Sequence, residues 1–186
     1  MNKKIMIGAA VMVASVTLVV STVALADSDE GEHGLFTRTG TVPAVNHKLY
    51  AAECGSCHFA YQPGWLPARS WQKMMGTLDQ HFGENAELGQ DARASITQYL
   101  MAEAADVKPN RKSRKILRSL SENETPLRIS TLSYIKHKHD EIPTRQMEGN
   151  PKVGSRANCV ACHTTAAKGY FDEHGVNIPG YGFWED

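Results

Sequence analysis

Two short motifs carry the residues that can do chemistry. Each motif has two cysteines separated by two residues and followed at once by a histidine: Cys54-Gly-Ser-Cys57-His58 and Cys159-Val-Ala-Cys162-His163. With this spacing, the two thiols can add across the two vinyl groups of a porphyrin, and the adjacent imidazole can bind the iron. We therefore expect two covalently attached haem c groups, with His58 and His163 as the proximal iron ligands.

Three other kinds of site use paired cysteines. A thioredoxin-like redox pair opens a helix inside a βαβ pattern, and the sequence has no such pattern. A four-cysteine zinc site separates its pairs by roughly 15 to 20 residues, whereas 101 residues lie between Cys57 and Cys159. Two structural disulfides would not need a histidine after each pair. Haem attachment is the interpretation that accounts for both histidines.

The function depends on what binds the far side of each iron. A second strong ligand makes an electron carrier, whereas an open position permits oxygen or peroxide chemistry. Helical periodicity predicts an amphipathic helix from the N-cap Ser70 to Phe82, with His81 on the same apolar face as Met74 and Leu78. A buried imidazole needs a polar partner. We therefore predict His81 as the second ligand of the first iron.

The same reasoning assigns His139 to the second iron. In a helical segment it shares a face with Leu132 and Ile135, while His137 points elsewhere. An alternating strand that would pair His137 with His139 is a competing interpretation. Other residues could take a distal position, namely His47, His174, Met74 and Met75.

The elements that must position these groups are short helices and irregular loops. The residues from Val45 onward predict a short helix leading into the first motif. A loop with two prolines follows, and its Tyr61 and Trp65 are expected to shield the haem. A second helix is predicted over residues 85–105. The aromatic tail from Gly169 is expected to cover the second haem.

Charge is balanced overall but not along the chain. The 20 Lys and Arg residues match 20 Asp and Glu residues, which excludes an acidic disordered tail and argues against a nucleic-acid binder. Residues 107–139 nevertheless carry nine basic and two acidic groups, and residues 108–118 contain six cations and no acid. This basic run is interpreted either as a solvated linker or as a landing site for an acidic redox partner.

The chain is expected to be exported and to contain two haem domains. Residues 1–26 have a short positive start and an apolar stretch ending in Ala-Leu-Ala, which is typical of a secretory signal, although an uncleaved signal would act as a membrane anchor. Residues 27–40 are a polar arm. We predict a mainly α fold with many irregular loops and little or no β structure, in which a first haem domain over 41–107 and a second over 126–186 are joined by a basic linker, 108–125.

These motifs resemble the small periplasmic dihaem cytochromes c, the DHC family. The resemblance covers most of the chain after the signal. It is carried by Cys54-Gly-Ser-Cys-His-Phe-Ala-Tyr-Gln-Pro, Leu66-Pro-Ala-Arg-Ser-Trp, His81-Phe-Gly-Glu-Asn-Ala, Pro126-Leu-Arg-Ile, His139-Asp-Glu-Ile-Pro and Asn158-Cys-Val-Ala-Cys-His.

The resemblance implies a two-domain, mainly helical electron-transfer protein of the periplasm. It implies bis-histidine ligation by His58 with His81 and by His163 with His139. It also implies redox proteins as partners, including an oxygen-binding monohaem cytochrome c and a membrane cytochrome b, with membrane contact only through such a partner or an uncleaved signal. The alternative from another class is a dihaem peroxidase-like enzyme with one accessible iron, although such enzymes are usually about twice as long.

Overall fold

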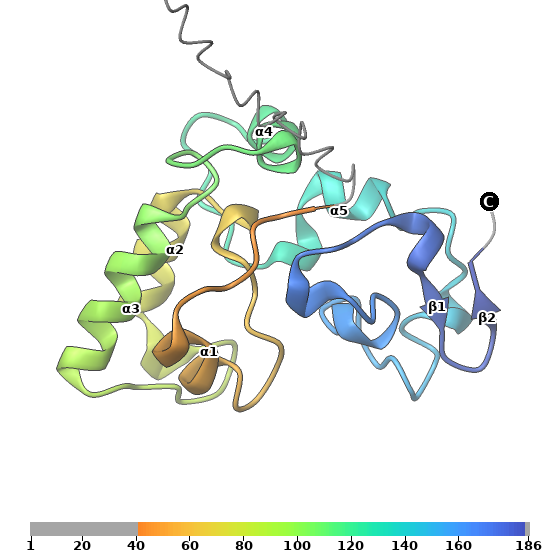
Figure 1. Cartoon of the computed structure of the whole chain (residues 1–186), viewed down its shortest axis with the longest axis horizontal. Coiled ribbons are helices and arrows are strands. Elements are labelled where there is room, and N and C mark those ends of the chain that lie inside the picture. The colour runs from red at the N-terminus through yellow and green to blue at the C-terminus, as the bar shows by residue number, and fades with distance from the viewer. Residues whose placement is uncertain (1–40, 185–186) are drawn as a thin grey trace, which may run out of the picture. The chain divides into compact units, whose positions relative to one another are not determined.

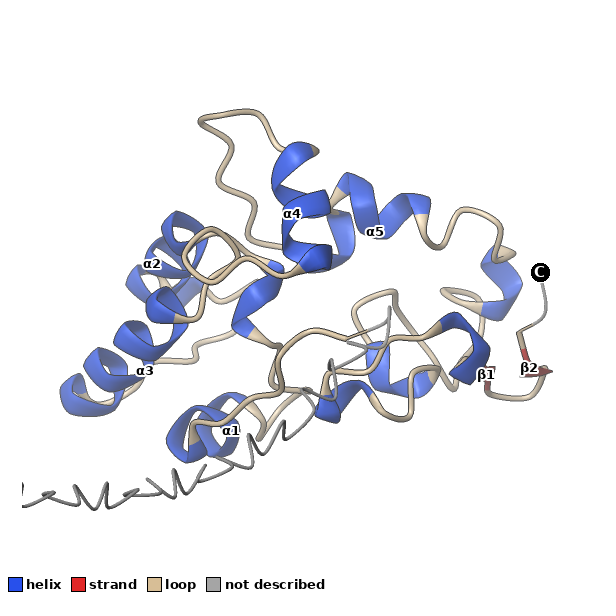
Figure 2. Cartoon of the chain, turned by 45° about the horizontal axis from the view of Figure 1, so that its top comes forward, coloured by secondary structure: helices blue, strands red, loops and turns tan. Residues whose placement is uncertain are grey.

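The computed structural model describes residues 41–184. The predicted signal, 1–26, and the predicted arm, 27–40, lie outside the described residues. Within 41–184, helices dominate and one two-stranded sheet is present (Figures 1 and 2). The α-helices are α1 Lys48–Cys54, α2 Ala68–Gly76, α3 Gln90–Ala102, α4 Arg111–Arg118 and α5 Ser133–His137, and the strands are β1 Asn177–Ile178 and β2 Gly182–Phe183. The predicted mainly α class with little β structure is confirmed.

Short 3₁₀ turns connect many of these elements. They are Pro63–Trp65, Leu78–Gln80, Ile129–Thr131, Thr144–Gln146, Cys159–Ala161, Ala166–Lys168 and Glu173–Gly175. The strands β1 and β2 pair antiparallel, with Asn177 opposite Phe183 and Ile178 opposite Gly182. In residues 41–184, no helix has the length and apolar character that a membrane span requires.

The largest core lies where α2 packs along α3. Both helices present apolar side chains at helical spacing, including Trp71 and Met75 from α2 and Ile96 and Leu100 from α3, and all four are buried. The same cluster continues to Ile116 of α4 and to Leu132. Burying a side chain of this size stabilises a fold by about 1.5–3 kcal/mol.

The helix around Ser70 differs from the sequence-based prediction at both ends. It begins at Ala68, and Ser70 is buried inside its first turn instead of capping it. The Asp106 carboxylate accepts a 2.8 Å hydrogen bond from the Ala68 N–H, so a residue distant in sequence satisfies the helix start. The helix ends at Gly76, well short of Phe82, and His81 therefore does not lie on its apolar face.

Two other predicted helices are shorter than expected. The helix predicted over 85–105 forms only over Gln90–Ala102. The predicted helical segment that includes Leu132 and His139 is interrupted at Leu132, whose ψ of 136° is extended, and α5 ends at His137. His139 therefore lies in the turn that follows a helix. The alternating strand around His137 is not formed.

The basic segment 108–125, predicted as a linker, contains a packed helix. Asn110 caps α4 by accepting hydrogen bonds from the backbone N–H groups of Lys112 and Ser113, at 2.8 and 3.0 Å. Ser113 and Ile116 are fully buried, and the Ser113 hydroxyl donates to the Gly64 carbonyl at 2.9 Å. This segment therefore contributes to the core as well as joining the two halves.

Hydrogen bonds connect the segment 42–62 with the segment 166–169. The Val42 N–H donates to the Gly169 carbonyl at 2.8 Å, and the Gln62 amide donates to the Ala166 carbonyl at 2.6 Å. Gly169 has a positive φ of 81°, and a Cβ there would lie 1.9 Å from the Val42 carbonyl oxygen, so only glycine fits. The division into domains over 41–107 and 126–186 stays a prediction.

Candidate metal centres

The first cysteine motif extends from the end of α1. Cys54 is the last residue of this helix and is half-buried, whereas Cys57 and His58 are exposed in the following turn. A Cβ on Gly55 would lie 2.1 Å from the Ala51 carbonyl oxygen, so the residue after Cys54 must be glycine for the turn to close. The turn thus presents Cys57 and His58 at the surface, beyond the end of the helix.

His81 lies opposite His58. Their ring centroids are 6.1 Å apart and the ring planes are within 18° of parallel. His81 reaches this place because the chain reverses after the 3₁₀ turn Leu78–Gln80, where His81 forms a β-bridge with Glu84 and Phe82 adopts a positive φ of 57°. The Arg128 guanidinium lies 4.0 Å from the centre of the Phe82 ring and covers this turn.

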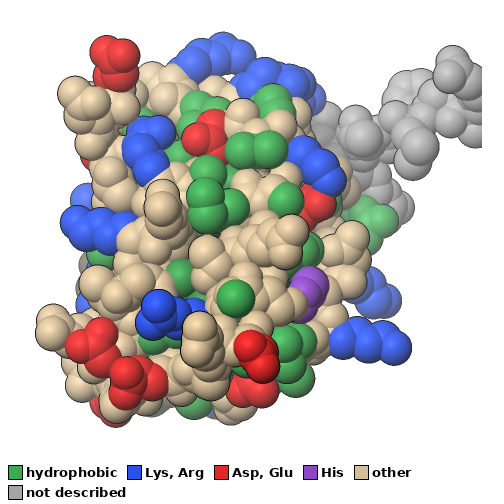
Figure 3. Space-filling model, turned by 90° about the vertical axis from the view of Figure 1, so that its left-hand side faces the viewer, with side chains coloured by type: hydrophobic (Ala, Val, Ile, Leu, Met, Phe, Trp, Pro, Cys, Tyr) green, Lys and Arg blue, Asp and Glu red, His purple; other side chains and the backbone are tan. Residues whose placement is uncertain are grey.

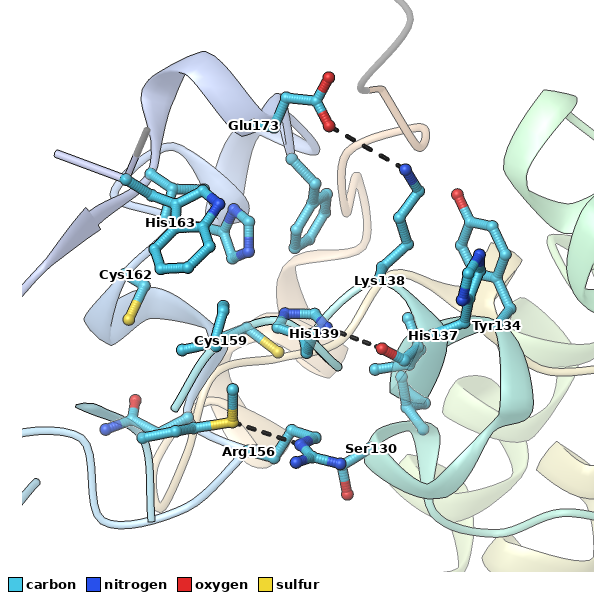
Figure 4. A pocket seen from close by; sticks show the side chains of 18 of the residues that line it. Ser130, Tyr134, His137, Lys138, His139, Arg156, Cys159, Cys162, His163 and Glu173 are labelled. Atoms are coloured by element: carbon cyan, nitrogen blue, oxygen red, sulfur yellow. Dashed lines mark hydrogen bonds and ion pairs between the residues drawn. The ribbon is translucent and has the colours of Figure 1, made fainter. Parts of the chain in front are cut away.

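The second cysteine motif lies on a cavity of about 560 Å³. Cys159, Cys162 and His163 line one side, and His139 lines the other (Figure 4). The rings of His139 and His163 are also 6.1 Å apart, but their planes are nearly perpendicular, at 80°. Cavities of this size accommodate cofactors.

Backbone carbonyls orient one imidazole in each pair. Nδ1 of His58 lies 2.8 Å from the Phe59 carbonyl, and Nδ1 of His139 lies 2.7 Å from the Ile135 carbonyl. A carbonyl oxygen only accepts, so each Nδ1 carries the proton and donates it. Nε2 is then left without a proton and available to a metal, which is the usual arrangement of a metal-binding histidine.

Burial keeps three of these imidazoles neutral. Burial, together with the neighbouring His139 and Lys112, lowers the pKa of His163 to about 4. Burial also lowers the pKa of His139 and of His81. A metal binds the neutral imidazole, so the environment favours the form that coordinates.

The thiols behave as protonated groups. Burial raises the pKa of Cys54 and of Cys159 to about 11, and the four cysteines form no disulfide. A redox dithiol depends on a thiol whose pKa is lowered. The pKa values therefore do not favour a thioredoxin-like site.

The alternative distal ligands are engaged elsewhere or exposed. His47 caps α1, because its Nδ1 accepts from the Tyr50 N–H at 3.1 Å, and its ring stacks on Tyr99 at 4.7 Å. His137 is exposed and pairs with Asp140 at 3.1 Å. His174 lines the second cavity but is exposed. Two methionines are accounted for by packing, since Met75 is buried in the core and Met74 packs against it.

Two aromatic residues around the second cavity were not predicted as parts of this site, whereas the tail that contains Phe171 was. Tyr61 and Trp65, expected to shield the first haem, line the second cavity, and Tyr61 also lies 5.4 Å from the His58 ring. Phe171 packs edge-on against Trp65 at 4.9 Å and lies 5.5 Å from His163. The aromatic loop was visible in the sequence, but its proximity to the second motif depends on long-range packing.

The spacing of both imidazole pairs fits a haem iron. An imidazole nitrogen binds a transition metal at about 2 Å, and the ring centre lies about 1 Å beyond that nitrogen. Two imidazoles on opposite sides of one metal ion therefore have centroids about 6 Å apart, and both pairs are at 6.1 Å. Each pair also has a cysteine pair beside it for covalent attachment. The residues present fit two haem c groups.

The chain is similar to known proteins in sequence and fold. The family model for dihaem cytochrome c matches residues 50–171. A diheme cytochrome c from Shewanella baltica OS155 is 41% identical, with a TM-score of 0.61 over 74% of this chain and 97% of its own. A diheme cytochrome c from Rhodobacter sphaeroides is 44% identical, with a TM-score of 0.64 over 70% of this chain and 100% of its own. None of the curated proteins compared with the chain matches it.

Proposed function

Because the chain belongs to the dihaem cytochrome c family and so carries two covalently bound haem c groups, we propose that it is a periplasmic electron carrier in which two histidines bind each iron. When bound, each haem accepts and releases one electron at its iron. The side chains of this protein hold and shield these two centres.

The main support for the proposal is the second imidazole that lies opposite each attachment motif. His81 faces His58 and His139 faces His163, both at 6.1 Å between centroids. An iron with two strong protein ligands has no free position for oxygen or peroxide, so it exchanges electrons without binding a substrate. The peroxidase-like alternative requires one accessible iron, and neither the geometry nor the comparisons favour it.

The aromatic side chains around the second cavity also suit an electron carrier. Tyr61, Trp65 and Phe171 place aromatic side chains around the cavity that the half-buried His163 lines. Apolar surroundings and restricted solvent access influence the reduction potential of a haem. The first centre has its attachment residues Cys57 and His58 exposed at the surface, so we propose that electrons enter and leave there.

We propose redox proteins as the partners, with an acidic protein docking by charge. Of the six cations in the basic run, Arg114 and Arg118 are exposed and do not line the second cavity. On the face seen in Figure 3, acidic and basic side chains are interspersed, and neither charge covers a large area. Charge reversal at Arg114 and Arg118 should slow electron transfer to an acidic partner at low salt, and salt should remove the difference.

Spectroscopy of the haem-loaded, oxidised protein tests the carrier proposal. We expect a mass increase of two haem groups, low-spin signals from both irons and no near-infrared band of a methionine ligand. Cyanide added to the oxidised protein and carbon monoxide added to the reduced protein should bind slowly or not at all. A high-spin iron that reacts rapidly with peroxide would support the enzyme instead.

A further inference from the structure

Five cations line the cavity of the second centre, and one of them, Arg156, forms an ion pair with Glu148 at 3.1 Å. The other four are Arg111, Lys112 and Lys115 of α4, and Lys138, which directly follows the end of α5, a helix that packs against α4. We call these four residues the cationic wall. They share the cavity with His139, His163 and the second cysteine pair.

The rotation of α4 about its axis determines which of its cations line the cavity. Ile116 and Ser113 are fully buried, and the bond from the Ser113 hydroxyl to Gly64 sets the rotation of the helix. Arg111 and Lys115 are four residues apart and so lie on one side of the helix. Arg114 and Arg118 are also four residues apart but do not line the cavity. The basic run therefore divides into two sets with different surroundings.

Within the described residues, three of the four cations of the wall form no ion pair within 4.0 Å, although four carboxylates also line the cavity. Among residues 41–184, the wall's one ion pair within 4.0 Å joins Lys138 to Glu173, as Figure 4 shows. Two other acidic residues on the cavity are engaged locally, since Asp140 pairs with His137 and Asp172 accepts from the His174 N–H. Glu141 lines the cavity but is exposed.

Lys112 is the most constrained member of the wall. It is half-buried, and in the described part of the chain its ammonium has no hydrogen bond or ion pair. Burial lowers its pKa, and so do the neighbouring Lys138 and Lys115, whereas the carboxylates of Asp172 and Glu173 oppose this shift. A cation held away from water beside other cations is costly unless an anion approaches it.

We propose that the cationic wall binds the propionate carboxylates of the haem attached to Cys159 and Cys162, with Lys112 as its central contact. Carboxylates form strong charge-assisted hydrogen bonds with lysine and arginine, and the haem is the one anionic group that the family requires at this cavity. The positive charge also favours the reduced iron, which carries one positive charge less than the oxidised iron. The wall therefore raises the reduction potential of this haem.

The test compares Lys112→Gln with Arg118→Gln in the haem-loaded protein. Both changes remove one positive charge from α4, but only the first removes it from the wall. Lys112→Gln should move one of the two reduction waves to lower potential, leave the other in place and shift the propionate bending band in resonance Raman spectra. Arg118→Gln should change neither measurement, and Lys112→Arg should restore both toward the original protein.

Lys115→Gln provides a second test at an exposed position of the wall, for the case in which Lys112→Gln does not fold. It should shift the same wave in the same direction. If Lys112→Gln or Lys115→Gln leaves both waves and the Raman band unchanged while slowing electron transfer to an acidic protein, the wall is a docking surface and the proposal is wrong. Equal shifts in Lys112→Gln and Arg118→Gln would also overturn it.

This inference rests on the haem at the second motif and not on histidine as its distal ligand. An experiment can therefore contradict bis-histidine ligation without contradicting propionate binding, and the reverse. A high-spin second iron would contradict bis-histidine ligation, whereas the comparison between Lys112 and Arg118 would still report on the propionates.

Discussion

The Tyr61 hydroxyl donates a hydrogen bond to the Ala157 carbonyl, which joins the loop after the first cysteine motif to the loop before the second. The same carbonyl accepts from the Cys159 N–H at 3.0 Å. Tyr61 also contacts His58 and lines the second cavity. One side chain thus touches both centres and holds the segment that carries Cys159.

Removing this hydroxyl should weaken the link between the two centres. Tyr61→Phe keeps the ring but loses one hydrogen bond, which is worth about 1 kcal/mol of the free energy of unfolding. Urea unfolding of the haem-loaded protein measures the loss. Tyr134→Phe is the matched control, because Tyr134 is half-buried at the same cavity and its hydroxyl has no hydrogen bond within residues 41–184. Equal stabilities of the two variants would contradict a role for the Tyr61 bond.

His81→Ala should remove the distal ligand of the first iron. One haem is expected to become high-spin and to bind cyanide rapidly, while the other keeps its low-spin spectrum. His47→Ala is the control, because His47 caps α1. It should lower stability by about 1 kcal/mol, the usual value of a helix cap, and leave both spectra unchanged. A high-spin signal in His47→Ala, with none in His81→Ala, would transfer the assignment to His47.

His139→Ala should remove the distal ligand of the second iron and make that haem high-spin. His137→Ala is the matched change two residues earlier, at an exposed histidine that pairs with Asp140. Absorption and electron paramagnetic resonance spectra should show one high-spin haem in His139→Ala and none in His137→Ala. Ligand entry should be slower than in His81→Ala, because the attachment residues of the second centre are half-buried, whereas Cys57 and His58 of the first centre are exposed. The reverse pattern would identify His137 as the ligand.

The angles between the imidazole planes predict two different low-spin signals. Parallel rings, as in His58 with His81 at 18°, donate into the same iron d orbital and split the d levels. Nearly perpendicular rings, as in His139 with His163 at 80°, donate into both orbitals and leave them close in energy. The oxidised protein should therefore show one three-line rhombic signal and one strongly anisotropic signal at low field. Two identical rhombic signals would contradict these orientations.

Gly169→Ala should destabilise the fold. The residue has a positive φ, which costs a residue with a side chain about 1–3 kcal/mol, and its Cβ would collide with the Val42 carbonyl. Gly76→Ala is the control, because it lies at the end of α2 with no atom near its Cβ position. Alanine in a helix is more stable than glycine by about 0.5–1 kcal/mol. Thermal unfolding should therefore shift in opposite directions in the two variants.

The sequence by itself determined the attachment chemistry. Two thiols and an imidazole within five consecutive residues define a haem c site without any knowledge of the fold, so both cysteine pairs, His58 and His163 could be assigned from local spacing. The helical class was also predictable, because α2 and α3 have apolar side chains at helical spacing. Helix ends were less predictable. The start of α2 depends on Asp106, which is distant in the sequence.

Only the tertiary structure decided what lies opposite each attachment site. His81 and His139 were selected as members of apolar helix faces, yet both lie in turns beyond a helix end, and chain reversals bring them to His58 and His163. In the sequence the basic run is one feature, because charge along a sequence does not reveal which side of a helix is buried. Packing of Ile116 divides it into cations that line a cavity and cations that face solvent, since burial of one face fixes the rotation of the whole helix.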